Sequence, residues 1–196
     1  MIIENKVHWA LDKNLCALLI HDMQTHYLTA LPSTLRSAVI AHTRTVAHAC
    51  MEREIPIFAS QVPLSQQSRE RGLMLDMWGK GPASGDQTLH PDLGLDTDVI
   101  RPLTKRSYSA FYGNDLEVML RRLGRDSLLI VGVYTSIGCQ CSAMDAFMRD
   151  IRPFVIADAT ADFNLSDHQA GLAHMSRLCA RVIDNDMVCE SLNTSP

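Results

Sequence analysis

The sequence predicts an α/β fold: a doubly wound parallel sheet of about six strands, covered by helices on both faces in three layers. Two observations lead to this prediction. Short apolar runs recur along the chain and are nearly continuous rather than alternating, which indicates strands buried on both faces. Helix-length amphipathic stretches lie between these runs, and that alternation favours a single domain over residues 1–196.

The candidate strands are apolar runs of five to eight residues, with the third and the last the weakest. They cover 15–21, 55–60, 98–103, 127–134, 153–158 and 181–185. The candidate helices cover 35–54, 114–123, 138–150 and 166–179. Asn114 with Glu117, and Ser166 with Gln169, have the spacing of capping boxes at two helix starts.

One long segment, 62–97, interrupts this alternation with prolines, glycines and polar residues. A stretch of this length inside a compact domain is either functional or disordered. Trp78 and the apolar residues at 73–77 favour an ordered flap.

Composition excludes several classes of protein. A chain of 196 residues with 46% hydrophobic residues can bury a core, and its net charge of −4 without a basic run argues against nucleic acid as a partner. No apolar run reaches the roughly 18 residues of a membrane span, and the N-terminus does not resemble a secretory signal. We interpret the cysteines as reduced thiols of a cytoplasmic protein; they are Cys16, Cys50, Cys139, Cys141, Cys179 and Cys189.

The carboxyl ends of parallel strands are where ligands bind in such sheets. Asp22 follows the first strand, where partial desolvation favours the protonated form of a general acid; a polar cap on the strand end is the alternative. Lys105 follows the third strand as a cation for a substrate carboxylate or for Asp22, or as a solvated loop residue. Gly138 begins a helix whose amides suit carboxylates or oxyanions. Cys139 beside it is a candidate thiolate or a small buried residue.

Five motifs in order resemble the isochorismatase branch of the cysteine-hydrolase-like superfamily, from about residue 8 to residue 190. They are "LLIHDMQ", "RGLMLDMWGKG", "TKRSYSAF", "GVYTSIGC" and "DAFMRDIRPFVIADATADF". The resemblance implies a site built on Asp22 and Lys105, with Gly138 where the superfamily has a nucleophilic cysteine. Cys139 comes one residue later, and one residue of a helix is a rotation of about 100°, so we expect Cys139 to point away from the substrate. "ASQVPLS" stands where nicotinamidases carry a metal motif, which implies no metal and no cofactor.

The implied activity is hydrolysis of the enolpyruvyl ether of isochorismate to 2,3-dihydro-2,3-dihydroxybenzoate and pyruvate. Asp22 would protonate the methylene carbon, without a covalent intermediate. One alternative is a 2-amino-2-deoxyisochorismate hydrolase of phenazine or aminobenzoate biosynthesis, and another is a cysteine amidohydrolase that uses Cys139. A non-enzymatic scaffold on the same fold is a further alternative.

The resemblance also implies how a dicarboxylate substrate is held. The implied pocket residues are Gln61, Arg71, Trp78, Tyr108, Phe111 and Tyr134. A cis peptide is implied at Val133–Tyr134. A homodimer is expected, and because the chain ends at Pro196, any aryl-carrier partner is expected to be a separate protein.

Overall fold

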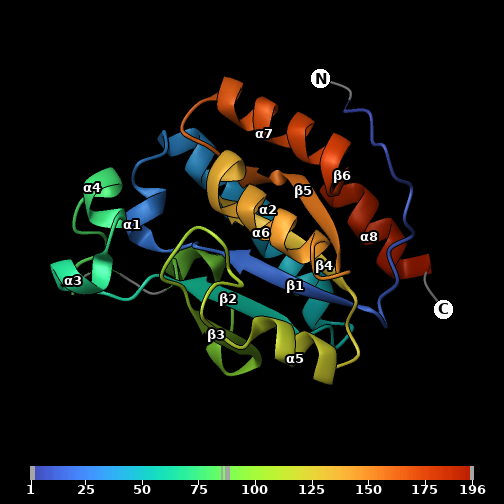
Figure 1. The fold of residues 1–196 in the computed structure, drawn as a ribbon. Coiled ribbons are helices and arrows are strands. Elements are labelled where there is room, and N and C mark those ends of the chain that lie inside the picture. The colour runs from blue at the N-terminus through green and yellow to red at the C-terminus, as the bar shows by residue number, and fades with distance from the viewer. Residues whose placement is uncertain (1–2, 85, 87–88, 195–196) are drawn as a thin grey trace.

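The computed structural model describes residues 3–84, 86 and 89–194, so Pro196 and the outermost residues of the predicted domain lie outside it. Six parallel strands form one sheet in the order β3-β2-β1-β4-β5-β6 (Figure 1). Their bounds are β1 Cys16–His21, β2 Ile57–Gln61, β3 Ile100–Thr104, β4 Ser127–Val133, β5 Arg152–Ala161 and β6 Arg181–Ile183. The predicted parallel α/β sheet is confirmed, and its order reverses between β1 and β4.

Helices cover both faces of this sheet (Figure 1). They are α1 Thr25–Leu28, α2 Ser33–Met51, α3 Ser68–Arg71, α4 Met74–Trp78, α5 Leu116–Arg122, α6 Gln140–Phe147, α7 Leu165–Leu178 and α8 Asn185–Thr194. One core cluster joins α2 and α8 to the sheet, and a second joins α5, α6 and α7 to its other face. No helix in the described residues is long and apolar enough to cross a membrane.

The continuous apolarity of β1 follows from this three-layer arrangement. Leu18 and Ile20 belong to the α2 cluster, whereas Ala17 and Leu19 belong to the opposite one. Every residue of β1 is buried. Each fully buried leucine or isoleucine contributes roughly 1.5–3 kcal/mol relative to an exposed one, so the central strands anchor the loops that follow them.

Both predicted capping boxes are wrong. Asn114 accepts a hydrogen bond from the Leu116 amide instead, and α5 has no side-chain cap. The cap of α7 is Asn164, whose side chain accepts from the Asp167 amide, because the helix starts at Leu165 rather than at Ser166.

Helix α8 was not predicted. The last candidate strand, 181–185, includes Asn185, which is the first residue of this helix. Asp184 caps the helix, because its side chain accepts from the Met187 amide, and the Asn185 amide donates to the Asp158 carboxylate. The cap is therefore a local signal, whereas the contact with Asp158, 27 residues away, is not.

The described part of the segment 62–97 is folded, as predicted for the flap. It contains α3, α4 and two 3-10 turns at Pro91–Leu93 and Thr97–Val99. Gly85, Gln87 and Thr88 lie outside the described residues. Helix α3 opens with a capping box between Gln67 and Glu70, so the flap has local stabilisation of its own.

Candidate active site

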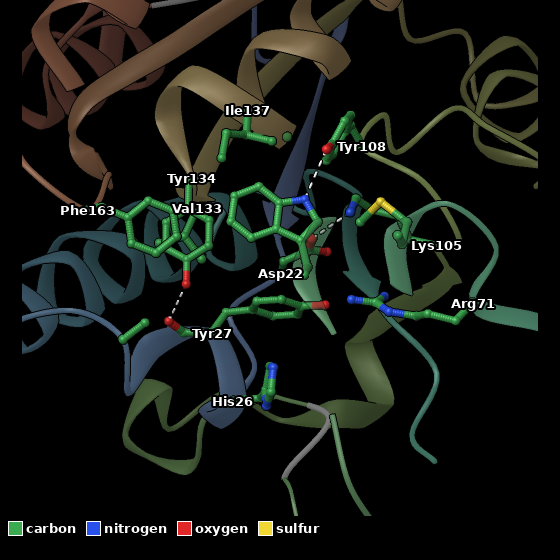
Figure 2. A pocket seen from close by; sticks show the side chains of 14 residues that line it. Asp22, His26, Tyr27, Arg71, Lys105, Tyr108, Val133, Tyr134, Ile137 and Phe163 are labelled. Carbon is green, nitrogen blue, oxygen red and sulfur yellow. Dashed lines mark hydrogen bonds and ion pairs between the residues drawn. The ribbon is translucent and has the colours of Figure 1, made fainter. Parts of the chain in front are cut away.

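A cavity of about 220 Å³ opens at the carboxyl ends of the strands, beside the point where strand order reverses (Figure 2). Its walls come from the β1 and β4 ends, the flap and the loop after β5. The lining residues are Asp22, His26, Tyr27, Ala30, Arg71, Met74, Trp78, Lys105, Tyr108, Val133, Tyr134, Ile137, Gly138 and Phe163.

Asp22 is the carboxylate of this cavity, and donors hold both of its oxygens. The Lys105 ammonium lies 2.6 Å from Oδ2, and the Ser60 hydroxyl donates to Oδ1 at 2.7 Å. The Asp22 amide donates back to Ser60 Oγ at 3.1 Å. Asp22 is 6% exposed, and its φ of 49° turns the chain sharply out of β1. This acid–cation pair is therefore rigidly placed and largely removed from water.

The turn after β4 faces Asp22 across the cavity. The peptide Val133–Tyr134 is cis, which confirms the prediction. One π-helical turn, Thr135–Cys139, then leads into α6, so the helical region begins before the predicted Gly138. Asp162 fixes this turn, because its Oδ2 accepts from the Ser136 amide at 2.6 Å.

Cys139 does not line the cavity. It is buried in the core cluster beneath α6 and α7, as its displacement by one residue predicted. Burial raises the pKa of its thiol well above the ordinary range, so the neutral thiol is the favoured form. An amidohydrolase mechanism that uses Cys139 finds no support in this geometry.

Aromatic side chains form one wall of the cavity (Figure 2). Trp78 of α4 stacks on Phe163 with ring centroids 6.0 Å apart, and Phe163 stacks on Tyr134 at 4.1 Å. The Trp78 indole N–H also donates to the Tyr108 hydroxyl at 2.9 Å. The flap is thus joined to two other loops across the cavity.

Arg71 supplies a second cation to the cavity, on the same side as Lys105 (Figure 2). It is 4% exposed, and its Nε donates to the Gly79 carbonyl at 3.0 Å. Its guanidinium points toward the Tyr27 hydroxyl (Figure 2). Burial raises the pKa of Tyr27, and the positive charge of Arg71 opposes that effect. Two buried cations in one small cavity suit a substrate with two negative charges.

Two of the predicted pocket residues do not reach the cavity. Gln61 ends β2, where its carbonyl accepts the Lys105 amide. Phe111 is buried in the core beside α5, with the Arg149 guanidinium 5.2 Å from its ring centroid. The chain turns inward there because the Ala110 amide donates to Ser142 Oγ on α6. The other predicted site residues line the cavity: Asp22, Arg71, Trp78, Lys105, Tyr108, Tyr134 and Gly138.

Sequence reasoning assigned no role to several residues that build the site, although it placed Ser60 at the end of the second strand. Tyr27 and Phe163 line the cavity, and Ser60 bonds to Asp22 behind it. The sequence contained a signal for two of them, because ligands bind at the carboxyl ends of parallel strands. Ser60 lies at the end of β2, and Phe163 lies in the loop just after β5. Among the residues with described positions, no cluster of three His, Cys, Asp or Glu could hold a metal ion.

A protein-family model described as the isochorismatase domain matches residues 16–187. The chain belongs to the isochorismatase family. Isochorismatase of Bacillus subtilis is 37% identical over 98% of this chain, and enterobactin synthase component B of Escherichia coli K12 is 38% identical over 93%. The chain spans 63% and 65% of those two proteins, less than two thirds of each.

A third relative of this isochorismatase-family chain is phenazine biosynthesis protein PhzD1 of Pseudomonas aeruginosa. It is 37% identical over 95% of the chain, which spans 90% of that protein. Among solved structures, a cysteine hydrolase from Pseudomonas syringae superposes with a TM-score of 0.87 at 17% identity, over 99% of both chains. An isochorismatase family protein from Burkholderia thailandensis has a TM-score of 0.82 at 23% identity, covering 94% of this chain and 98% of its own. These two structures share the fold.

Proposed function

We propose that this chain hydrolyses the enolpyruvyl ether of isochorismate to pyruvate and 2,3-dihydro-2,3-dihydroxybenzoate. The observation that carries the proposal is the Asp22–Lys105 pair in a cavity lined, within the described residues, by no serine, threonine or cysteine. Such a site offers a proton donor and cations but no side chain suited to forming an acyl-enzyme. Hydrolysis of a vinyl ether needs a proton donor and water only.

The reaction begins with protonated Asp22. Its proton passes to the methylene carbon, the π electrons of the double bond form the new C–H bond, and an oxocarbenium cation develops on the neighbouring carbon. Water adds to that carbon and gives up a proton to the Asp22 carboxylate. The hemiketal then collapses, and the C–O bond to the ring breaks while the hemiketal proton moves to the departing oxygen. Asp22 ends the cycle protonated, and atoms and charges balance.

The two cations give the substrate its orientation. Arg71 pairs with one carboxylate, where a bidentate guanidinium is geometrically suited. Lys105 lies between Asp22 and the second carboxylate. A bound carboxylate would therefore share the Lys105 ammonium with Asp22.

The aromatic wall protects the cationic intermediate. Trp78, Phe163 and Tyr134 exclude bulk water from the face that they cover. One water molecule is needed in the reaction, and unselective attack by others is suppressed. The flap therefore has a chemical role as well as a binding role.

A second candidate substrate is 2-amino-2-deoxyisochorismate, which carries the same enolpyruvyl ether. The phenazine relative is as similar in sequence as the isochorismatase relative and is covered over more of its length. The same Asp22 chemistry applies to both substrates. A homodimer, a cytoplasmic location and a separate carrier protein stay predictions.

Pyruvate release tests the proposal. Native, Asp22→Asn and Cys139→Ala proteins are each given the two substrates without added metal. We expect native and Cys139→Ala proteins to release pyruvate and Asp22→Asn to lose at least about 1000-fold in kcat, since its amide has no acidic proton to transfer. The faster substrate identifies the pathway. No pyruvate from either substrate would overturn the proposal and would direct the test to amide substrates, with Cys139 as the candidate nucleophile.

A further inference from the structure

Gly138 is a glycine for a steric reason that lies in another strand. A Cβ at position 138 would stand 2.2 Å from Cε1, 2.9 Å from Nε2 and 3.0 Å from Nδ1 of His21. Real Cβ atoms do not approach other atoms as closely as 2.2 Å. The φ of Gly138 lies outside the left-handed region, so its backbone conformation is open to any residue. The three atoms nearest to that Cβ all belong to the imidazole of His21.

His21 is held in that place by its surroundings. It is fully buried, and its Nδ1 lies 2.9 Å from the Val133 carbonyl oxygen. A carbonyl only accepts, so Nδ1 carries the hydrogen and donates it. Burial lowers the pKa of His21, which favours the neutral ring, while the backbones of Val133 and Tyr108 act in the opposite direction. Nε2 has no hydrogen-bond partner among the described residues.

His21 also lies against the acid. Its Nδ1 is 3.6 Å from Asp22 Oδ2, although neighbouring residues of a strand normally point to opposite faces. The positive φ of Asp22 bends the chain at the end of β1 and brings the two side chains together. One imidazole therefore touches the acid, the β4 end and the position of the missing side chain.

We propose that His21 is a positioning residue that occupies the space of a side chain at position 138 and thereby commits the site to proton transfer from Asp22. The inference rests on the proposed function and deepens it. With the imidazole in place, residue 138 presents only its backbone to the substrate, and no nucleophile can stand there. The same ring fixes the Val133 carbonyl and the direction of the turn that carries Tyr134 and Gly138.

A double-mutant cycle tests this inference through pyruvate release. Gly138→Ala should lower kcat by about 100-fold, because the methyl group displaces the imidazole that positions the site. His21→Ala alone should lower kcat about tenfold and leave KM within about threefold, since His21 does not line the cavity. The protein that carries both changes should recover at least about tenfold over Gly138→Ala, because the new methyl group enters the space left by the ring.

Gly171→Ala provides the matched control. The three atoms nearest to a Cβ there would all belong to Ser136, at 3.0–3.2 Å, in the turn that also carries Gly138. His21→Ala should therefore not rescue Gly171→Ala. Equal rescue of both glycine variants, or no rescue of Gly138→Ala, would overturn the inference. If Gly138→Ala is insoluble, a soluble double variant counts as rescue and an insoluble one counts against it.

Thermal unfolding separates this inference from the proposed function. Gly138→Ala should lower Tm by about 5 °C or more in the native background and by less than about 2 °C in the His21→Ala background. If the native protein releases no pyruvate, the proposed function is overturned. The comparison of Tm values in the two backgrounds still tests whether His21 occupies the space of a side chain at position 138. Equal Tm losses in both backgrounds overturn the inference even if the enzyme is active.

Discussion

Asp22 is held by two hydrogen-bond donors, of which only one can also accept a hydrogen bond. The Lys105 ammonium can only donate a hydrogen bond, whereas the Ser60 hydroxyl can donate or accept. When Asp22 is ionised, the Ser60 hydroxyl donates a hydrogen bond to Oδ1. When Oδ1 carries a proton, the same hydroxyl can accept a hydrogen bond from it. Ser60 can therefore stay bonded to Asp22 in both protonation states, which an acid passes through in every cycle.

Ser60→Ala is expected to lower kcat by about tenfold with little change in KM, because a buried carboxylate oxygen loses its partner while the substrate contacts remain. Steady-state pyruvate assays measure both constants. Ser176→Ala is the control, since Ser176 is also buried but bonds to the Ala173 carbonyl within α7. A rise in KM with unchanged kcat would contradict this role for Ser60.

At the scale of elements, the short helix α4 closes the site. Its tryptophan contacts residues from two other segments, Tyr108 after β3 and Phe163 after β5. The helix has no buried residue of its own, so these contacts, rather than a hydrophobic core, hold it over the cavity. A segment held this way is suited to opening for substrate and closing over it.

Trp78→Ala is expected to raise KM about tenfold and to lower kcat by a smaller factor, because one side of the cavity becomes open to water. Trp78→Phe should lie between this variant and the native protein, since it keeps a stacking ring but loses the bond to Tyr108. Leu73→Ala in the same flap should behave as native, as Leu73 is 82% exposed. An equal effect from Leu73→Ala would indicate that the flap acts only through its general stability.

At the scale of the whole molecule, the buried thiols couple stability to pH. All six cysteines are free thiols, and four of them are buried. Burial raises the pKa of Cys16 from 9.0 to about 12. In the unfolded chain this thiol ionises near pH 9, while in the folded chain it stays protonated. Its contribution to stability is therefore complete below about pH 9 and is lost as the pH rises toward 12.

Urea unfolding under reducing conditions should show the free energy of unfolding falling between pH 9 and pH 11. In Cys16→Ala the decline should be shallower by about 1 kcal/mol per pH unit, because one thiol no longer releases its proton on unfolding. Identical slopes for the two proteins would show that Cys16 does not contribute to the decline.

Prediction from sequence succeeded where the physical cause is local. The central strands were found because burial on both faces leaves a continuous apolar run, as in Ser127–Val133, whereas the edge strand Ile100–Thr104 is partly exposed and gives a weaker signal. Asp22 and Lys105 were found because they follow strands that end at the same edge of the sheet. Phe111 was misplaced because Ser142, on a distant helix, draws the neighbouring backbone into the core.

The sequence by itself determined the strand order along the chain, the burial of both sheet faces, and the pairing of an acid with a lysine where a nucleophile is missing. The strands, their burial and the acid–lysine pair follow from apolar periodicity and from residues at strand ends, which are properties of short segments, whereas the missing nucleophile is what the family resemblance implies. Only the tertiary structure decided that His21 fills the space at Gly138, that Ser60 holds Asp22, and that Phe163 meets Trp78. The partners in each pair are separated by tens of residues or more, and their distances are set by the packing of the strands, helices and loops that carry them.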